Sequence, residues 1–333
     1  MNVLLAYNNR RTLSTLYNKQ DVRGRNNNDD HQSVKKALLK NNHKVKTLTV
    51  DKKILSNISK LKSCDIVFNL ADEGFYENVP SQEPYFPAFL DTNEIKYTGS
   101  NYLTLGISNN KALTKNLLLG SRIPTPKFQI ISHHKERRNT KLCFPLIVKP
   151  LCEDGSVGIR NDSVVRNTPQ LKNRIKFVLS TYQQPALVEE YIEGREFNVA
   201  ILGNEKPEVL EISEIIFDLP KNFNKIVSYN AKWLSRSKEY KGTTPKCPAV
   251  VSKRLRKKII EISLNVYNTL NIQDYGRIDL RVNKNNVFVI EANPNPDISE
   301  NGGLANIARK SGMRYEQLIQ KILQYAVERN KKL

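Results

Sequence analysis

The sequence lacks the cysteine spacing that builds disulfide or structural zinc frameworks. It has four scattered cysteines in 333 residues, with no C-x-x-C pair: Cys64, Cys143, Cys152 and Cys247. No apolar run approaches the roughly 20 residues of a membrane-spanning helix. The start of the chain, Met1–Asn8, has no basic flank and too short an apolar stretch for a signal peptide. These absences argue against a secreted or membrane-bound protein and predict a cytoplasmic one.

Acidic residues are few relative to basic ones. Thirty-three Asp and Glu stand against 53 Lys and Arg, which gives a formal net charge of +20. Such an excess is found in proteins that bind nucleic acid. However, the densest basic run, Lys253–Lys258, opens a segment with helical apolar spacing and has no interleaved aromatic residues. We therefore interpret it as a solvated helix face. The remaining positive charge is spread along the chain. It either reflects a general compositional bias or serves to attract an anionic substrate.

Short apolar runs alternate with a helical segment near the N-terminus. Strands are expected at Val3–Tyr7, Lys44–Val50 and Asp65–Leu70, and a helix at Ser33–Lys40. This alternation predicts a parallel α/β layer. A polar stretch at 8–30, rich in Asn and Arg, interrupts the layer. A loop of this length in a compact domain is usually functional or mobile.

The rest of the chain predicts two further lobes that mix strands and helices. The expected strands are Phe128–Ile131, Leu146–Lys149, Ala186–Glu190, Glu196–Leu202, Val209–Ile215, Arg277–Val282 and Val287–Ala292. The expected helices are Lys111–Leu119, Thr168–Ser180, a long one from Val250, Leu304–Lys310 and Tyr315–Val327. We predict three domains, 1–107, 108–190 and 191–333, with a mobile polar loop at 228–247 in the third.

Two carboxylates are expected to face each other on the last predicted hairpin. Asp279 and Glu291 lie near the ends of its strands, where they can stand opposite each other on one face. Together with the amide of Asn293 they would form an oxygen cluster suited to Mg²⁺. The alternative is a salt-bridged surface hairpin, because Arg277 is two residues from Asp279.

A lysine ends an apolar strand beside a turn of small residues. Lys149 follows Leu146–Val148, and the turn spans Glu153–Gly158. Backbone N–H groups of such a turn can approach phosphate, although no Walker A pattern is present. We expect Lys149 to have few structural uses, so that its loss leaves thermal stability nearly unchanged.

Two glutamates flank a chain reversal at Gly194. Glu189 and Glu196 are seven residues apart, and the segment between them can act as a hinge. Such a hinge can present backbone groups to an adenine edge and a carboxylate to ribose hydroxyls. The alternative is a charged interdomain linker.

The order of these motifs resembles the ATP-grasp fold, and more narrowly the D-alanine–D-alanine ligase family. The helix with Lys111, the turn Tyr97–Ser100 and the segment Tyr229–Trp233 match that family as well. The resemblance runs from about residue 65 to 323. It implies an α/β and α+β protein with an N-terminal Rossmann-like (pre-ATP-grasp) lobe. The implied activity is an ATP-dependent, ADP-forming carboxylate–amine ligase, in which a carboxylate attacks the γ-phosphate and an amine captures the acyl phosphate.

The resemblance also implies a role for each matching residue. The ATP-binding residues would be Lys111, Lys149, Glu153, Ser156, Glu189, Tyr191, Ile192 and Glu196. Glu189 would contact the adenine amino group, and Glu196 would contact the ribose. Asp279, Glu291 and Asn293 would hold two Mg²⁺ ions, with Mn²⁺ as a substitute. The catalytic positions would be Arg277, Lys232 and Gly303.

The departures from the family lie on the amino-acid side. The histidine expected after the third strand is absent, and Asp72, Glu73 and Glu77 stand nearby. These acids suit an amine substrate, or they merely pair with the many Lys and Arg residues. After Asn293 the family's serines are missing. The candidate substrate pocket is Asp72, Glu73, Ser299, Asn301 and Leu304.

Intact ATP motifs beside altered pockets predict the same reaction on different substrates. The first hypothesis is a ligase for an amino acid or peptide, with small-molecule partners and possible homodimerisation. The second is a ligase or carboxylate kinase for a larger cell-envelope or natural-product substrate. The third is a non-catalytic nucleotide-binding protein whose basic surface binds nucleic acid. The complete metal-ligand set argues against the third hypothesis.

Overall fold

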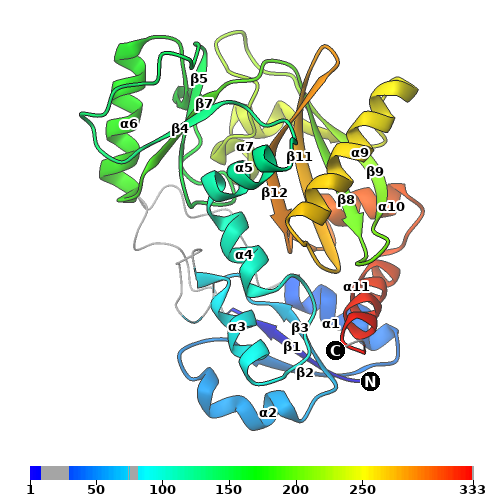
Figure 1. Ribbon diagram of the computed structural model, residues 1–333. Coiled ribbons are helices and arrows are strands. Elements are labelled where there is room, and N and C mark those ends of the chain that lie inside the picture. The colour runs from blue at the N-terminus through cyan, green and yellow to red at the C-terminus, as the bar shows by residue number, and fades with distance from the viewer. Residues whose placement is uncertain (9–29, 74, 76–81, 332–333) are drawn as a thin grey trace.

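Three sheets form the framework of the chain, and helices cover each of them (Figure 1). The structure is a computed structural model that describes residues 1–8, 30–73, 75 and 82–331. The predicted polar stretch at 8–30, apart from its two ends, lies outside these residues, and so does Glu77.

The N-terminal sheet is parallel and has the order β2-β1-β3. Its strands are β1 (Asn2–Tyr7), β2 (Lys44–Thr49) and β3 (Ile66–Leu70). Its helices are α1 (Asp30–Lys40), α2 (Ile58–Lys62), α3 (Tyr85–Thr92) and the C-terminal α11 (Tyr315–Arg329). Strand β1 is apolar because both faces are covered. Val3 and Leu5 pack with α1 and α11, whereas Leu4 and Ala6 pack with α2 and α3. The predicted parallel α/β layer is confirmed.

The second sheet is antiparallel, with the order β4-β7-β5-β6. Its strands are β4 (Phe128–Ile131), β5 (Leu146–Pro150), β6 (Val164–Val165) and β7 (Ala186–Glu190). Helix α6 (Thr168–Tyr182) packs on one face, in one core with Val148 and Val188. Because side chains alternate along a strand, the neighbouring Lys149 and Glu189 point to the opposite face.

The third sheet is also antiparallel, with the order β10-β9-β8-β11-β12. Its strands are β8 (Arg195–Leu202), β9 (Glu208–Phe217), β10 (Thr243–Lys246), β11 (Tyr275–Asn283) and β12 (Asn286–Pro294). Helix α9 (Lys253–Thr269) covers one face, where it shares a core with Phe197 and Val199. Glu196 and Asn198 alternate with these two residues and line a pocket on the other face.

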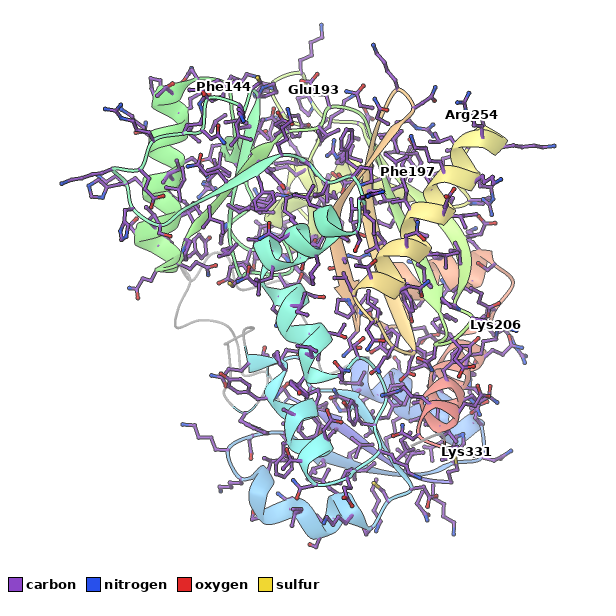
Figure 2. All side chains as sticks on the ribbon, in the orientation of Figure 1. Phe144, Glu193, Phe197, Lys206, Arg254 and Lys331 are labelled. Atoms are coloured by element: carbon purple, nitrogen blue, oxygen red, sulfur yellow. The ribbon has the colours of Figure 1, made fainter. Side chains whose placement is uncertain are left out.

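The basic run that opens α9 is a solvated face, as predicted. Leu255 and Ile259 are buried against the sheet, while most of the basic residues between and before them are exposed. Figure 2 shows Arg254 extending away from the start of the helix. The helix is amphipathic, so its charge belongs to the solvent side of an ordinary packed helix.

The remaining helices are short and lie between the elements already described. They are η1 (Ile54–Asn57), α4 (Tyr102–Asn109), α5 (Lys111–Gly120), η3 (Asn161–Ser163), α7 (Tyr229–Trp233), α8 (Lys238–Lys241) and α10 (Gly303–Lys310). Within the part of the chain that the structure describes, no helix has the length and apolar character needed to cross a membrane.

The prediction of a polar loop at 228–247 is wrong, because this segment contains α7, α8 and β10. The side chains of Ser228 and Ser237 accept hydrogen bonds from the N–H groups of Ala231 and Tyr240 and so cap the two helices. Strand β10 pairs with β9 at the sheet edge. Its stability comes from that neighbour rather than from apolar side chains, so the polar sequence concealed it.

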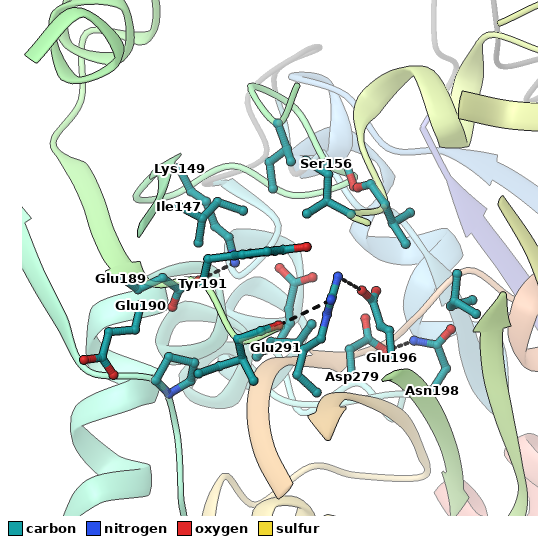
Figure 3. A pocket seen from close by; sticks show the side chains of 18 of the residues that line it. Ile147, Lys149, Ser156, Glu189, Glu190, Tyr191, Glu196, Asn198, Asp279 and Glu291 are labelled. Carbon is teal, nitrogen blue, oxygen red and sulfur yellow. Dashed lines mark hydrogen bonds and ion pairs between the residues drawn. The ribbon is translucent and has the colours of Figure 1, made fainter. Parts of the chain in front are cut away.

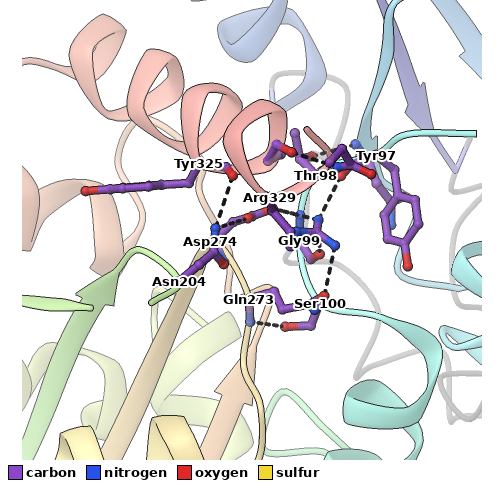
Figure 4. Close-up of polar contacts among 12 residues, drawn as sticks. Tyr97, Thr98, Gly99, Ser100, Asn204, Gln273, Asp274, Tyr325 and Arg329 are labelled. Atoms are coloured by element: carbon purple, nitrogen blue, oxygen red, sulfur yellow. Dashed lines mark hydrogen bonds and ion pairs between the residues drawn. The ribbon is translucent and has the colours of Figure 1, made fainter. Parts of the chain in front are cut away.

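The C-terminal helix α11 ties the third sheet to the first (Figure 4). Asp274, which is fully buried, accepts hydrogen bonds from the N–H of Gly99 (2.7 Å) and from Arg329 Nη2 (3.1 Å). Arg329 also donates to the carbonyls of Tyr97 and Gly99.

The three sheets lie within 1–107, 108–190 and 191–333. We propose these ranges as the domains, with α11 packing back onto the first.

Candidate active site

A pocket lies between the inner faces of the second and third sheets. Figure 3 shows Lys149 and Glu189 on one side of it and Glu196, Asn198 and Asp279 on the other. The predicted site residues that line it are Lys149, Ser156, Glu189, Tyr191, Ile192, Glu196, Lys232, Arg277, Asp279 and Glu291. The structure thus gathers residues from separate sequence motifs around one pocket.

The carboxylate of Glu189 is buried between two lysines on the pocket wall. Its Oε1 atom lies 2.5 Å from Lys149 Nζ, and its Oε2 atom lies 2.8 Å from Lys115 Nζ. Burial raises the pKa of a carboxyl group, but the two lysines outweigh it and hold the pKa of Glu189 at about 2. Its Oε2 atom has acceptor capacity left beside the contact with Lys115, so that a donor on a ligand can share this oxygen with that lysine.

Sequence reasoning missed Lys115. It lies one helical turn after Lys111 on α5, so that the two side chains share a face of the helix. Its ammonium group also donates to Thr125 Oγ1 (2.6 Å), and burial lowers its pKa. The four-residue spacing from Lys111 was the available signal.

The expectation that Lys149 has few structural uses is wrong, because its ammonium group pairs with the buried Glu189. We expect Lys149→Ala to lower the free energy of unfolding by about 1–3 kcal/mol, since a buried carboxylate loses a partner. Urea denaturation measures this change, and calorimetric titration measures the accompanying loss of ATP affinity. Lys127→Ala is the matched control, since the Lys127 side chain is 70% exposed and 3.9 Å from Glu190. Equal stability of Lys149→Ala and the control would contradict the structural role.

The β11–β12 hairpin places its polar residues in direct cross-strand pairs. Asp279 stands opposite Glu291, as predicted, and Arg277 stands opposite Asn293. Arg277 Nε and Nη2 donate to the two oxygens of Asp279 at 2.7 and 2.9 Å, which makes a bidentate pair. Burial lowers the pKa of Arg277, but Asp279 and Glu291 reverse this and raise it. The two alternatives for this hairpin, an oxygen cluster for a metal and a salt-bridged surface hairpin, therefore involve the same residues.

Asp279 has two further partners, one of which sequence reasoning missed. Asn198 on β8 donates to Asp279 Oδ1 (2.7 Å), and Asn293 donates to Oδ2 (3.0 Å). Asn198 stands directly opposite Asp279 in the sheet. Its position two residues after Glu196, on the same strand face, was the available signal.

Glu291 forms the other half of the cluster. Its Oε1 atom lies 3.1 Å from Lys111 Nζ. Burial opposes ionisation of this carboxyl group, but Lys111, Lys232 and Lys149 prevail and hold its pKa at about 2. Within the described ranges no three His, Cys, Asp or Glu residues form a metal-binding group. A metal here would rely on two carboxylates, an amide and the ligand, which suits Mg²⁺ with phosphate.

The turn at 153–158 touches the segment that carries Lys232. Ser156 Oγ donates to the carbonyl of Val227 (2.8 Å), and Trp233 Nε1 donates to that of Gly155 (2.9 Å). Gly155 and Ser156 both have positive φ, which curls the backbone of the turn. The Glu153 carboxylate accepts a hydrogen bond from Gln184, while its carbonyl accepts one from Lys111 Nζ. The turn and α7 together close one side of the pocket.

The candidate substrate residues do not line this pocket. Glu73 is buried at the end of the first sheet, where its N–H donates to Asn8 Oδ1 (3.0 Å). Ser299 donates its N–H to Asp297 (2.8 Å), and Leu304, on α10, is fully buried in the core. Asp72 is half-buried, and the carbonyl of Asn301 accepts from Asn306. None of the five therefore belongs to the wall of the pocket that holds the charged cluster.

The sequence and the fold are both similar to those of known proteins. A family model described as "D-ala D-ala ligase C-terminus" matches residues 117–324. "Uncharacterized protein y4sG" of Sinorhizobium fredii is 34% identical, over 89% of this chain and 87% of its own length. The D-alanine–D-alanine ligase of Pseudothermotoga lettingae is 30% identical, over 89% of this chain and 93% of its own length.

A solved structure shows the fold. The D-alanine–D-alanine ligase from Bacillus anthracis, complexed with ATP, superposes with a TM-score of 0.75. The superposition covers 100% of this chain and 99% of the other at 21% identity. The predicted ATP-grasp architecture is thereby confirmed.

Proposed function

Since this chain belongs to the D-alanine–D-alanine ligase family and is an ATP-dependent, ADP-forming ligase, we propose that it joins a carboxylate to an amine through an acyl phosphate. The substrates in this proposal are an amino acid or peptide pair other than two D-alanines. The observation that carries the proposal is the hairpin cluster of Arg277, Asp279 and Glu291, which shares one pocket with Lys149 and Lys232. This arrangement offers cations to a phosphoryl group and oxygens to a metal.

The proposed nucleotide-binding roles are assigned to residues that line the pocket or contact its lining residues. Lys111 and Lys149 would contact ATP phosphates, with the 153–158 turn covering them. Glu189 would accept a hydrogen bond from the adenine amino group, which the remaining acceptor capacity of its buried Oε2 atom supports. Tyr191 and Ile192 would line the base, and Glu196 would bind the ribose.

We propose that Asp279, Glu291 and Asn293 bind two Mg²⁺ ions. Mn²⁺ would be able to replace Mg²⁺ at both positions. The donor set fits, because both carboxylates face the pocket on adjacent strands and neighbouring lysines keep Glu291 ionised. When bound, the metal supplies charge neutralisation to the phosphates. The cations Arg277 and Lys111 hold these carboxylates in place.

The chain's own residues have separate tasks in the reaction. Arg277 would stabilise the negative charge that develops on the reacting carbonyl oxygen. Lys232 lies on α7, beside the contact between Trp233 and the turn, where it can reach a terminal phosphate. Closure of α7 against the turn would exclude water from a reactive acyl phosphate. Gly303 is the proposed substrate-side catalytic position.

D-Alanine alone is expected to give little or no D-alanyl-D-alanine at saturating ATP. The substrate-side residues Asp72, Glu73, Ser299 and Asn301 differ from the family pattern, and each lost charge-assisted contact costs about 1.5–3 kcal/mol. An ADP-release screen over amino-acid pairs and dipeptides, with mass spectrometry of the products, measures the preference. Turnover of D-alanine equal to that of the best pair would show that these residues rebuild the usual pockets.

A second candidate is a larger carboxylate, such as a cell-envelope or natural-product precursor. It is favoured by the open space beside Gly303, where an added Cβ would meet no atom of a described residue within 4 Å. Longer peptides and bulky acids in the same screen would distinguish this candidate from small amino-acid pairs.

We also propose a cytoplasmic protein without a nucleic-acid partner, which its four free cysteines and its solvated α9 face support. A homodimer is supported by the exposed leucines of α4 and α5, among them Leu103 and Leu113. Analytical ultracentrifugation tests the oligomeric state.

A further inference from the structure

Strand β11 carries a second buried arginine, Arg281, for which the proposed reaction has no role. Its side chain lines the pocket and is only 4% exposed. A guanidinium group is costly to remove from water unless it is fully paired. Arg281 Nη2 lies 2.7 Å from Glu196 Oε2, and the two residues are direct cross-strand partners. The guanidinium group also lies 5.5 Å from the ring centroids of Tyr191 and Phe217.

Arg281 also joins separate segments of chain around one end of the pocket. Its Nη1 atom donates to the carbonyls of Ile192 and Gly194, each at 3.4 Å. Its Nη2 atom donates to the carbonyl of Lys225. Tyr191 contacts the same carbonyl through its hydroxyl group (3.1 Å). One side chain therefore connects β11, the linker after β7 and the segment before α7.

We propose that Arg281 is a positioning residue that makes the site selective for a ribonucleotide. The inference rests on the proposed role of Glu196 at the ribose. A carboxylate distinguishes a hydroxyl from a hydrogen most sharply when its oxygens are fixed in direction toward that hydroxyl. The guanidinium group of Arg281 fixes the direction of the Glu196 carboxylate through the 2.7 Å contact, whereas methionine would fill the same space without this contact. Lysine would keep the charge but lose the planar fork of the guanidinium group.

The test compares calorimetric dissociation constants for ATP, 2′-deoxy-ATP and 3′-deoxy-ATP. The wild type is expected to bind ATP at least about tenfold more tightly than one of the two deoxy analogues. Arg281→Met should reduce this ratio to within about threefold of unity. Arg281→Lys should give an intermediate ratio, and it serves as the test if the methionine variant does not fold.

Two further variants separate selectivity from general damage. Glu196→Gln should lose the same discrimination as Arg281→Met. Arg256→Met should keep it, because Arg256 pairs with Glu211 on the same sheet but outside the pocket. An unchanged ratio in both Arg281 variants overturns the role of Arg281 alone. A wild type that binds ATP without any ribose preference overturns the role of Glu196 and this inference, and a wild type that does not bind ATP overturns the nucleotide site itself.

Discussion

Replacement of Glu291 by glutamine is expected to reduce ADP formation with the best substrate pair by at least about 10³-fold. The change keeps the shape of the side chain but removes its negative charge. In the wild type, Lys111 and neighbouring lysines keep the Glu291 carboxyl group ionised. A catalytic metal contributes several kcal/mol of charge stabilisation, and each 1.36 kcal/mol corresponds to about tenfold in rate. Coupled ADP assays with Mg²⁺ or Mn²⁺ measure this loss.

The metal assignment has an independent readout in binding. Calorimetric titration of Mn²⁺ in the presence of ADP should show loss of a site in Glu291→Gln. Glu193→Gln is the control, because Glu193 is an exposed carboxylate outside the pocket (Figure 2). Near-normal turnover of Glu291→Gln with its best substrate would show that the metal assignment is wrong.

Arg277→Lys is expected to lower kcat by about 10²–10³-fold, while the affinity for ATP changes by less than about tenfold. Lysine retains a positive charge but cannot reproduce the two parallel contacts to Asp279 at 2.7 and 2.9 Å. Loss of one preorganised donor to a developing oxyanion has an effect of this size. Initial rates at saturating ATP, together with calorimetry, separate the two quantities.

The control for Arg277→Lys is Arg254→Lys, at the exposed start of α9. It should leave both quantities unchanged, since this side chain extends into solvent. If Arg277→Lys instead lowers the affinity for ATP and kcat by the same factor, Arg277 has only a structural role in the pocket.

Most of the secondary structure could be predicted because it depends on local patterns. The strand at Asn2–Tyr7 is an apolar run, and the helix at Lys253–Thr269 has apolar residues at helical spacing. The segment 228–247 could not be predicted in this way. Its helices depend on serine caps, and β10 depends on its pairing with β9, neither of which leaves an apolar pattern.

Part of the candidate site also followed from local geometry. The hairpin brings Asp279 and Glu291 to the same end of its two strands, but the bulge between Asp279 and Leu280 decides their direct pairing. Residues at equal distances from the turn would place Asp279 opposite Ile290 instead. The partners of Glu189 did not follow, because Lys115 and Lys149 reach it from a helix and from another strand. The structural use of Lys149 was misjudged for the same reason.

The sequence by itself determined the longer strands and helices and their order, the family and the presence of an ATP-dependent ligase reaction. Periodicity, turn residues and short motifs record these properties locally along the chain. Only the tertiary structure decided which charges are neutralised, as in the pairs Arg281–Glu196 and Arg329–Asp274, and that α11 returns to the first sheet. These contacts join residues 55 or more positions apart. They form because sheet register and core packing bring buried ions together, and a buried ion must find a partner wherever the fold supplies one.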